Sequence, residues 1–385
     1  MKLNRKNWTD STIGEIAVEV SDRVENPSQS EYEKFIGLEE FESGLFKIRK
    51  WGSTENLVSA MKLFKSGDIL FARRNAYLRR ASQVDFDGVC SGDAIVLRQK
   101  NGIEKNLLTY LLNTNKFWEY AVANAAGTMS KRVKWRDLVR YSFLLPPLTE
   151  QTQIAELFQS METAIEQAEQ QEKNLRVMYK NLIDGFVSDK PLFGALLKYK
   201  QLKSVNFTDV SKKLLRKIDA AKIGIERIVA GENLESEDFK IRTWGIVGIN
   251  FLGPAFHVLF KPGDILYGSR RTYLRKVALA DFEGVCSNTT YVIRADDKVL
   301  LQDLLKHVML SEKFTQYSIG VSKGSTNPYI NWKDLDNFSF QIPDLDTQKE
   351  MVYVLDKIIE LAEKFREQKQ SLKSLKQKLL NELLG

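Results

Sequence analysis

Residues 64–98 read FKSGDILFARRNAYLRRASQVDFDGVCSGDAIVLR, and residues 260–294 read FKPGDILYGSRRTYLRKVALADFEGVCSNTTYVIR. The two stretches align without gaps at a constant offset of 196, and 18 of the 35 positions are identical. Chance does not produce this degree of identity. Self-similarity at a fixed period is the signature of a repeated structural unit, so the chain contains a duplication.

The duplication extends on both sides of these stretches. The upstream matches pair Phe46-Lys47-Ile48-Arg49 and Trp51-Gly52 with Phe239-Lys240-Ile241-Arg242 and Trp244-Gly245. The downstream matches pair Gly127, Trp135, Asp137, Leu138, Phe143, Pro146 and Gln151 with Gly324, Trp332, Asp334, Leu335, Phe340, Pro343 and Gln348. Two copies of roughly 195 residues are too few for a solenoid, which needs about three stacked units. We therefore expect two large domains related by a pseudo-two-fold axis.

Each copy is predicted to have an α+β fold. Gly-Asp at 67–68 and at 263–264 indicates a tight turn before short apolar strands at 69–71 and 265–267. Segments 88–90 and 94–97 suggest two further short strands. Helical stretches are expected near 104–120 and 301–317.

A long helix is predicted at the end of each copy, because apolar residues there recur at alternating spacings of four and three. The first seam contains Ile154, Phe158, Met161, Ile165, Ala168, Leu175, Tyr179, Leu182 and Phe186, and is broken at Glu172. The second contains Met351, Leu355, Ile358, Ala362, Phe365, Leu372, Leu379 and Leu383, and is broken at Lys369 and Lys376. The expected organisation is a globular domain at 1–146, a spacer helix at 147–187, a second globular domain at 188–343 and a second spacer helix at 344–385.

A heptad seam of this length favours a helical partner. We expect the two helices to pair as an antiparallel coiled coil; the alternative is that each packs only on its own domain. In the antiparallel pair, Glu172 and Lys369 could approach each other and fix the register, or both could extend into solvent.

Composition excludes several classes of protein. The 385 residues carry 43% apolar side chains and a net charge of +7, typical of a globular chain. No apolar run approaches the ~18 residues of a membrane span, so a cytoplasmic protein is expected. The only cysteines and histidines are Cys90, Cys286, His257 and His307, whose spacing fits no common zinc site. We expect no metal site and no bound cofactor, and two reduced, structural thiols.

Basic residues with interleaved aromatics gather at equivalent places in the two copies. Such residues suit contacts with phosphates and base edges, although a charge run is often only a solvated face. The candidate DNA-binding residues of the first copy are Arg73, Arg74, Tyr77, Arg79, Arg80, Lys131, Arg132 and Lys134. Those of the second copy are Arg270, Arg271, Tyr273, Arg275, Lys276, Lys323, Asn327 and Tyr329.

The tips next to these residues differ between the copies. Residues 129–134 read MSKRVK, whereas residues 326–331 read TNPYIN. Because specificity commonly lies in loops carried by a rigid scaffold, this divergence suits two readers of different sequences.

The pattern resembles the specificity subunit of type I restriction–modification systems over essentially the whole chain. In the second copy the likeness lies in Gly324-Ser325-Thr326, Ile330-Asn331-Trp332, Leu335, Ile342-Pro343 and Gln348. In the first it lies in Gly127-Thr128, Trp135, Leu138, Leu145-Pro146-Pro147-Leu148-Thr149-Glu150-Gln151 and Ile154-Ala155. The second copy departs from this pattern at Asp344-Leu345-Asp346, which puts equal affinity of the two helix ends for a partner in doubt.

The resemblance implies that each domain reads one half of a split, asymmetric site in double-stranded DNA. It implies that the helices set the spacer and dock two modification subunits, which would use S-adenosylmethionine to methylate adenine. A separate restriction subunit, a motor and nuclease, would use ATP and Mg²⁺. The chain itself is then not an enzyme.

Motifs for catalysis are missing from the sequence. We find neither a glycine-rich methyl-donor loop nor a phosphate-binding loop for ATP. Two alternatives remain open: a specificity subunit of a related system that pairs with a fused methylase–nuclease, as in type IIB or IIG enzymes, and a coiled-coil scaffold without a DNA role. The scaffold predicts no salt-dependent binding to duplex DNA.

Overall fold

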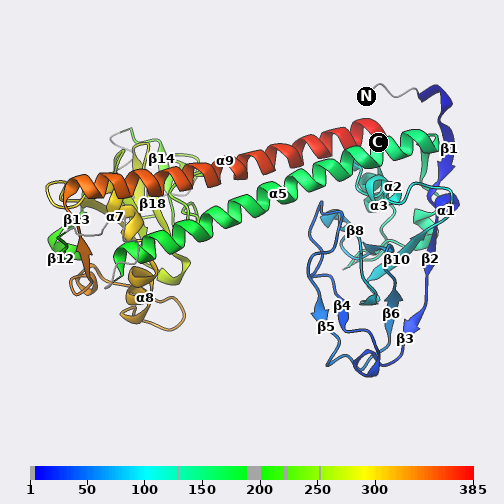
Figure 1. Cartoon of the computed structure of the whole chain (residues 1–385), viewed down its shortest axis with the longest axis horizontal. Coiled ribbons are helices and arrows are strands. Elements are labelled where there is room, and N and C mark those ends of the chain that lie inside the picture. Colours follow the sequence, from blue (N-terminus) through cyan, green and yellow to red (C-terminus); the bar gives the residue numbers. More distant parts are fainter. Residues whose placement is uncertain (1–4, 129, 189–200, 220–223, 251–252) are drawn as a thin grey trace. The chain divides into compact units, whose positions relative to one another are not determined.

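The computed structural model describes residues 5–128, 130–188, 201–219, 224–250 and 253–385. The chain forms two compact units (Figure 1). Unit 1 comprises Met1–Ala168 and Glu367–Gly385, and unit 2 comprises Glu169–Arg366. Each unit therefore contains one copy of the repeat together with segments of both long helices.

The described residues of unit 1 form three sheets. Their strand orders are β1-β11, β2-β10-β7-β8 and β3-β6-β9-β4-β5. The strands are β1 (Thr9–Thr12), β2 (Ala17–Val20), β3 (Arg23–Val24), β4 (Lys34–Ile36), β5 (Gly52–Ser53), β6 (Met61–Phe64), β7 (Ile69–Ala72), β8 (Ala81–Gln83), β9 (Gly88–Cys90), β10 (Ala94–Gln99) and β11 (Ser142–Leu145).

Unit 2 repeats this arrangement, except that its third sheet has no counterpart of β3 in the described residues. Its sheets have the orders β12-β21, β13-β20-β17-β18 and β15-β14-β19-β16. The strands are β12 (Lys203–Asn206), β13 (Ser211–Leu214), β14 (Arg227–Val229), β15 (Gly245–Ile246), β16 (Phe256–Phe260), β17 (Ile265–Gly268), β18 (Val277–Leu279), β19 (Gly284–Ser287), β20 (Thr290–Ala295) and β21 (Ser339–Ile342). The parallel pair β4–β9 recurs as β14–β19, which confirms the duplicated α+β fold.

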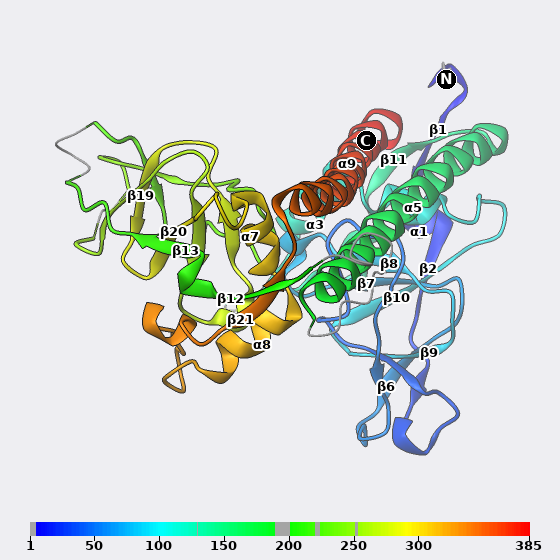
Figure 2. The same ribbon diagram turned by 60° about the vertical axis from the view of Figure 1, so that its left-hand side comes forward.

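The central sheet of each unit is buried on both faces. Along β7, Ile69 and Phe71 belong to the hydrophobic cluster that includes the helices of unit 1. Leu70 and Ala72 belong to the hydrophobic cluster that includes the five-stranded sheet. Successive strand residues point to opposite faces, so an apolar run without polar alternation fits a sheet covered on both sides. In unit 2, helix α7 (Gln302–Val308) packs against β18 and β20, the neighbours of β17 in the central sheet (Figure 2).

The short helices differ from the sequence prediction in one respect. Each predicted single helix is two: α2 (Leu107–Leu111) and α3 (Asn115–Ala123) in unit 1, and α7 (Gln302–Val308) and α8 (Glu312–Gly320) in unit 2. The break comes at a hydroxyl residue that begins the second helix, because Thr114 Oγ1 accepts from Phe117 N–H and Ser311 Oγ accepts from Phe314 N–H. The remaining short helices are α1 (Ile13–Ile16) and α4 (Trp135–Leu138).

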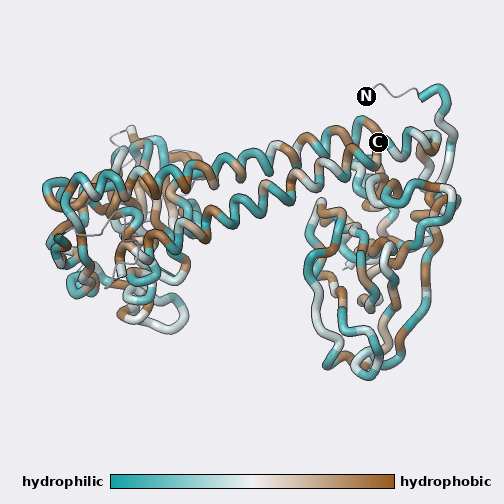
Figure 3. The backbone as a smooth tube through the Cα atoms, viewed as in Figure 1, coloured by the Kyte–Doolittle hydropathy of each residue, from teal (hydrophilic) through white to brown (hydrophobic). Residues whose placement is uncertain are grey.

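The long helices are α5 (Leu148–Val187) and α9 (Leu345–Leu384), each of 40 residues. Their apolar residues alternate with polar ones along the ribbon (Figure 3). In unit 1, Ile154 and Phe158 of α5 share a core with Leu380 and Leu384 of α9. In unit 2, Tyr179 and Ile183 of α5 share a core with Met351 and Leu355 of α9. The beginning of each helix thus packs against the end of the other, which makes them antiparallel. Both cores also include residues of the globular domain, so the two packing modes weighed from the sequence occur together.

The predicted seam of α9 was wrong near its C-terminus. Lys376, read as a polar break, is 4% exposed, and Leu380 is fully buried, whereas Leu379 and Leu383 lie at the edge of the core. A straight α-helix drifts relative to a 3.5-residue repeat, and this shifts the buried face over several turns. Glu172 pairs with Arg176 one turn along α5, and its approach to Lys369 stays a prediction.

A buried glutamine fixes the start of each long helix. Gln151 donates from Nε2 to Pro146 O at 2.8 Å and accepts from Glu104 N–H at 2.9 Å. Gln348 donates to Pro343 O at 3.0 Å and accepts from Leu301 N–H at 2.9 Å. These bonds tie the helix to the loop before α2 or α7, so each globular domain is held in a set orientation on its helix.

Candidate nucleic-acid interface

The structure brings the two predicted basic segments of each copy together. In unit 1 the backbones of Arg74 and Arg132 form an antiparallel bridge. It is flanked by hydrogen bonds from Val133 N–H to Arg73 O at 2.9 Å and from Asn75 N–H to Lys131 O at 3.2 Å. Segments more than fifty positions apart in sequence thus form one surface.

Unit 2 builds the same bridge with different residues. Arg270 pairs with Tyr329, and Arg271 N–H donates to Pro328 O at 2.6 Å. Tyr329 also pairs with Lys323, just as Arg132 pairs with Ala126 in unit 1. The backbone frame is therefore common to both copies, and the side chains that it presents are not.

A strained turn lies beside each bridge. Non-glycine residues occupy the left-handed region at both ends of a 3₁₀ turn: Asn75 (φ 56°) and Arg79 (φ 50°) in unit 1, and Arg271 (φ 51°) and Arg275 (φ 51°) in unit 2. Each such residue costs on the order of 1–3 kcal/mol, and such strain concentrates at functional sites. The turns, Ala76–Leu78 and Thr272–Leu274, present Tyr77 and Tyr273 at 67% and 51% exposure. An exposed tyrosine on a rigid, basic loop suits contact with DNA.

In unit 1 a single carboxylate lies among the arginines. Arg132 Nε donates to Asp93 Oδ1 at 2.8 Å, and Arg74 Nη1 lies 3.5 Å from Asp93 Oδ2. Arg74 Nε also donates to Ser130 Oγ at 2.7 Å. The hydrogen bond from Arg132 holds the pKa of Asp93 below its usual value and raises the pKa of Arg132. Asp93 thus orients both guanidinium groups.

Unit 2 has a hollow at the equivalent place. Its volume is about 290 Å³, and its lining includes Arg270, Arg271, Lys276, Thr289 and Asn327. Arg271 Nε donates to Asn327 Oδ1 at 3.3 Å. No side-chain hydrogen bond or ion pair of Arg270 is found in the described part of the chain, so its guanidinium is available to an anionic ligand.

Several of the predicted residues also make contacts that hold the fold. The side chain of Arg275 is 10% exposed, and its guanidinium pairs with Glu237 and Glu312. Its guanidinium is thus held within unit 2, and a contact of Arg275 with DNA stays a prediction. Arg80 and Lys276 donate to the carbonyl oxygens of Leu38 and Gly231, which ties the loop to the strand segment after β4 or β14.

The remaining candidates retain access to solvent. Arg73, Arg74 and Asn327 are half-buried. The exposed ones are Tyr77, Arg79, Lys131, Arg132, Lys134, Arg270, Arg271, Tyr273, Lys323 and Tyr329.

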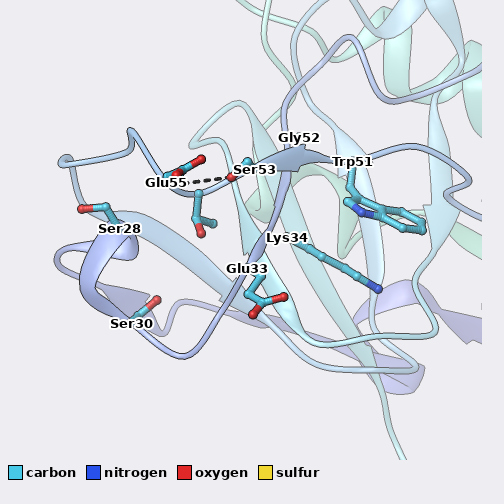
Figure 4. A pocket seen from close by; sticks show the side chains of 9 residues that line it. Ser28, Ser30, Glu33, Lys34, Trp51, Gly52, Ser53 and Glu55 are labelled. Atoms are coloured by element: carbon cyan, nitrogen blue, oxygen red, sulfur yellow. Dashed lines mark hydrogen bonds between the residues drawn. The ribbon is translucent and has the colours of Figure 1, made fainter.

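One repeated surface feature was missed from the sequence. Lys34 Nζ lies 4.3 Å from the ring centre of Trp51 and 4.2 Å from that of Phe86. Unit 2 repeats this stack with Arg227, Trp244 and Phe282. The Trp-Gly dipeptides at 51–52 and 244–245, which align between the two copies, were the sequence signal for this stack. Figure 4 shows Lys34 and Trp51 at the rim of a hollow of about 580 Å³ beside β5. The half-exposed indoles could stack on a planar ligand.

Cys90 and Cys286 are free, buried and equivalent, on β9 and β19. Burial raises the pKa of each thiol to about 12, so neither is a reactive thiolate. Within the described ranges, no group of three or more His, Cys, Asp or Glu residues could hold a metal ion. The same part of the chain has no helix long and apolar enough to cross a membrane.

Comparison with known proteins agrees with this duplicated design. Residues 5–175 and 208–374 match the family described as the type I restriction modification DNA specificity domain. The chain belongs to this family and carries two copies of its domain, which confirms the resemblance inferred from the sequence.

Two relatives agree with the assignment, and two solved structures share the fold. The chain is 32% identical over 109 residues to the type I restriction enzyme EcoDI specificity subunit of Escherichia coli, covering 28% of this chain and 24% of that protein. It is 24% identical over 318 residues to the MjaVIII specificity subunit of Methanocaldococcus jannaschii, covering 77% of this chain and 73% of that one. A type I restriction–modification S subunit from M. genitalium matches with a TM-score of 0.59 at 13% identity, covering 100% of this chain and 98% of that one.

A chain from a structure concerned with assembly and conformational transition of the type I R-M system also has a TM-score of 0.59. It is 22% identical and covers 99% of this chain and 98% of that one. At these identities the two structural likenesses show the fold alone.

Proposed function

We propose that this chain is the DNA-reading subunit of a type I restriction–modification complex, in which units 1 and 2 each read one half of a split, asymmetric site. The observation that carries this proposal is the bridge between two basic loops, built by Arg74 and Arg132 in one unit and by Arg270 and Tyr329 in the other. A shared frame with different side chains is what two readers of different sequences require.

The helices have a second role in this proposal, which is to dock two modification subunits and to set the spacer between the half-sites. A helix of 40 residues is about 60 Å long, more than one turn of DNA. Within unit 2, α5 exposes Val177 and Met178, each 51% exposed, over a hollow of about 460 Å³. Apolar residues of this size on a surface helix suit a protein partner.

In this proposal, the modification and restriction subunits carry out catalysis. The modification subunits would bind S-adenosylmethionine and methylate adenine, and a restriction subunit would use ATP and Mg²⁺ to move along and cut DNA. This chain would supply the choice of site and no reacting group.

Binding to duplex DNA at increasing salt tests the DNA-reading function. A reader that neutralises phosphates loses affinity linearly on a log–log plot, with a slope of about −0.9 per phosphate contact. We expect a slope steeper than about −3, because each unit exposes several basic side chains at its bridge. A coiled-coil scaffold without a DNA role would show neither the slope nor a preferred sequence after selection from a random duplex library.

A further inference from the structure

Unit 1 holds its two bridging arginines with one carboxylate, and unit 2 does not. Asp93 accepts from Arg132 Nε through Oδ1 and lies within ion-pair distance of Arg74 through Oδ2. The repeat places Thr289 at the equivalent position in unit 2, where it lines the open hollow beside Arg270. The two surfaces therefore share a frame but differ in how their cations are held.

The hydrogen bonds of Arg132 leave one edge of its guanidinium available. Nε is taken by Asp93, and within the described chain no side-chain partner occupies Nη1 or Nη2. Those two nitrogens form the fork that can donate two parallel hydrogen bonds to O6 and N7 of guanine in the major groove. Arg74 is constrained from two sides, by Ser130 at Nε and Asp93 at Nη1. The side chains of Arg74 and Arg132 are 43% and 44% exposed, so they remain accessible while held.

We propose that Asp93 is a positioning residue, an inference that rests on the proposed function. By orienting Arg74 and Arg132, Asp93 makes these arginines recognise guanine in the half-site of unit 1, where freely moving arginines would contact phosphates of any sequence. A guanidinium that is already oriented loses less conformational entropy when it binds DNA, and its fixed direction lets it distinguish one base from another. A nearby carboxylate also repels phosphate and lowers affinity for DNA of arbitrary sequence. Unit 2, with Thr289, reads its half-site by a different set of contacts.

The substitution that tests this role is Asp93→Asn. It keeps the shape and the backbone bonds of the residue, which are those from Arg73 N–H to Asp93 O and from Asp93 N–H to Ser91 Oγ. A matched control is Asp85→Asn, which removes the same charge from an exposed turn of unit 1. Asp93→Glu tests rescue by a second carboxylate. All three are assayed in the full chain with its modification subunits.

The probes are a duplex that carries the site selected by the wild-type chain and a duplex of random sequence. For Asp93→Asn we expect preference for the correct first half-site to fall about 10-fold or more. Affinity for random duplex should rise, and the salt slope should steepen by about 1–2, because two arginines are freed for phosphates. In Asp93→Asn, preference for the correct second half-site should stay as in wild type. Asp85→Asn should leave the preference at both half-sites unchanged, and Asp93→Glu should restore part of the preference at the first half-site.

Equal loss of specific and random binding with an unchanged salt slope would overturn the positioning role, as would a first half-site without an essential G·C pair. A wild-type chain that shows no salt-dependent duplex binding would instead contradict the proposed function itself.

Discussion

Lys376 of α9 lies buried against Glu162 of α5, with Nζ 2.5 Å from Oε1 and both side chains less than 10% exposed. Nζ also lies 3.8 Å from the ring centre of Phe46, so the pair joins both helices to the globular domain of unit 1. Removing one partner of a buried pair leaves an uncompensated charge. We predict that Glu162→Leu lowers the free energy of unfolding by about 3–5 kcal/mol.

The double variant Glu162→Leu, Lys376→Met should recover most of that loss, because apolar residues of similar volume often replace a buried pair without cost. Urea unfolding of Glu162→Leu, Lys376→Met and the double variant measures the coupling between the two sites. The exposed pair Lys378–Glu382 on the same helix is the control, and Lys378→Met there should change stability by less than about 1 kcal/mol. Additive effects at 162 and 376 would contradict this account.

Unit 2 has a buried histidine where unit 1 has Tyr110. His307 Nε2 lies 3.0 Å from Asp356 Oδ1, and Nδ1 lies 2.9 Å from Tyr179 Oη. Lys306, beside it, also pairs with Asp356. Burial lowers the pKa of His307 despite the neighbouring carboxylate.

Because that folded-state pKa lies below the unfolded value of about 6.5, the unfolded chain takes up the proton first as pH falls. We predict that stability is full above about pH 7 and falls as pH drops through 6.5 toward the folded pKa, by up to about 1.4 kcal/mol per pH unit. His307→Gln should flatten this slope, whereas His257→Gln, at a half-buried site, should retain it. Unfolding midpoints measured between pH 5 and 8 check the prediction, and a slope that survives His307→Gln would refute it.

The two bridges should act on separate half-sites. Arg270→Ala removes a guanidinium that makes no side-chain hydrogen bond or ion pair with the residues that the structure describes, so we expect little change in stability. We predict a loss of about 1–3 kcal/mol in binding a duplex with the second half-site, and none at the first. Arg74→Ala should show the reverse pattern, so each variant is the control for the other in gel-shift titrations. Equal losses at both half-sites would mean that these arginines do not read sequence.

The glutamine at the start of α9 should be important for stability. Gln348 is fully buried, and Gln348→Ala would leave Leu301 N–H and the carbonyls of Val299 and Pro343 without this partner. We predict a loss of about 1–3 kcal/mol in the free energy of unfolding. Gln368→Ala, on an exposed part of the same helix, should be close to neutral. A Gln348 variant as stable as that control would show that the contacts are dispensable.

The repeat made the fold predictable, because two copies of one pattern separate the frame from its varying side chains. It also singled out the two basic segments of each copy that the structure brings together. The burial of individual side chains was harder to predict from the sequence. Arg275 aligns with the exposed Arg79, yet Glu312 replaces Asn115 beside it and captures the guanidinium. Lys376 was misplaced because a 3.5-residue repeat does not follow the buried face over forty residues.

Asp93 was missed from the sequence for a different reason. The search was for cations, and only the fold shows that this carboxylate lies between two of them.

The most direct test of the central claim is to express this chain with the modification subunits of its own system in a host without other DNA methylation. Single-molecule sequencing then locates every modified adenine. Two units that read two half-sites predict one bipartite motif, whose halves are separated by a fixed, unspecified gap. A continuous motif would contradict the claim. The absence of any motif would also contradict it, provided that the complex is shown to be assembled and to bind the methyl donor.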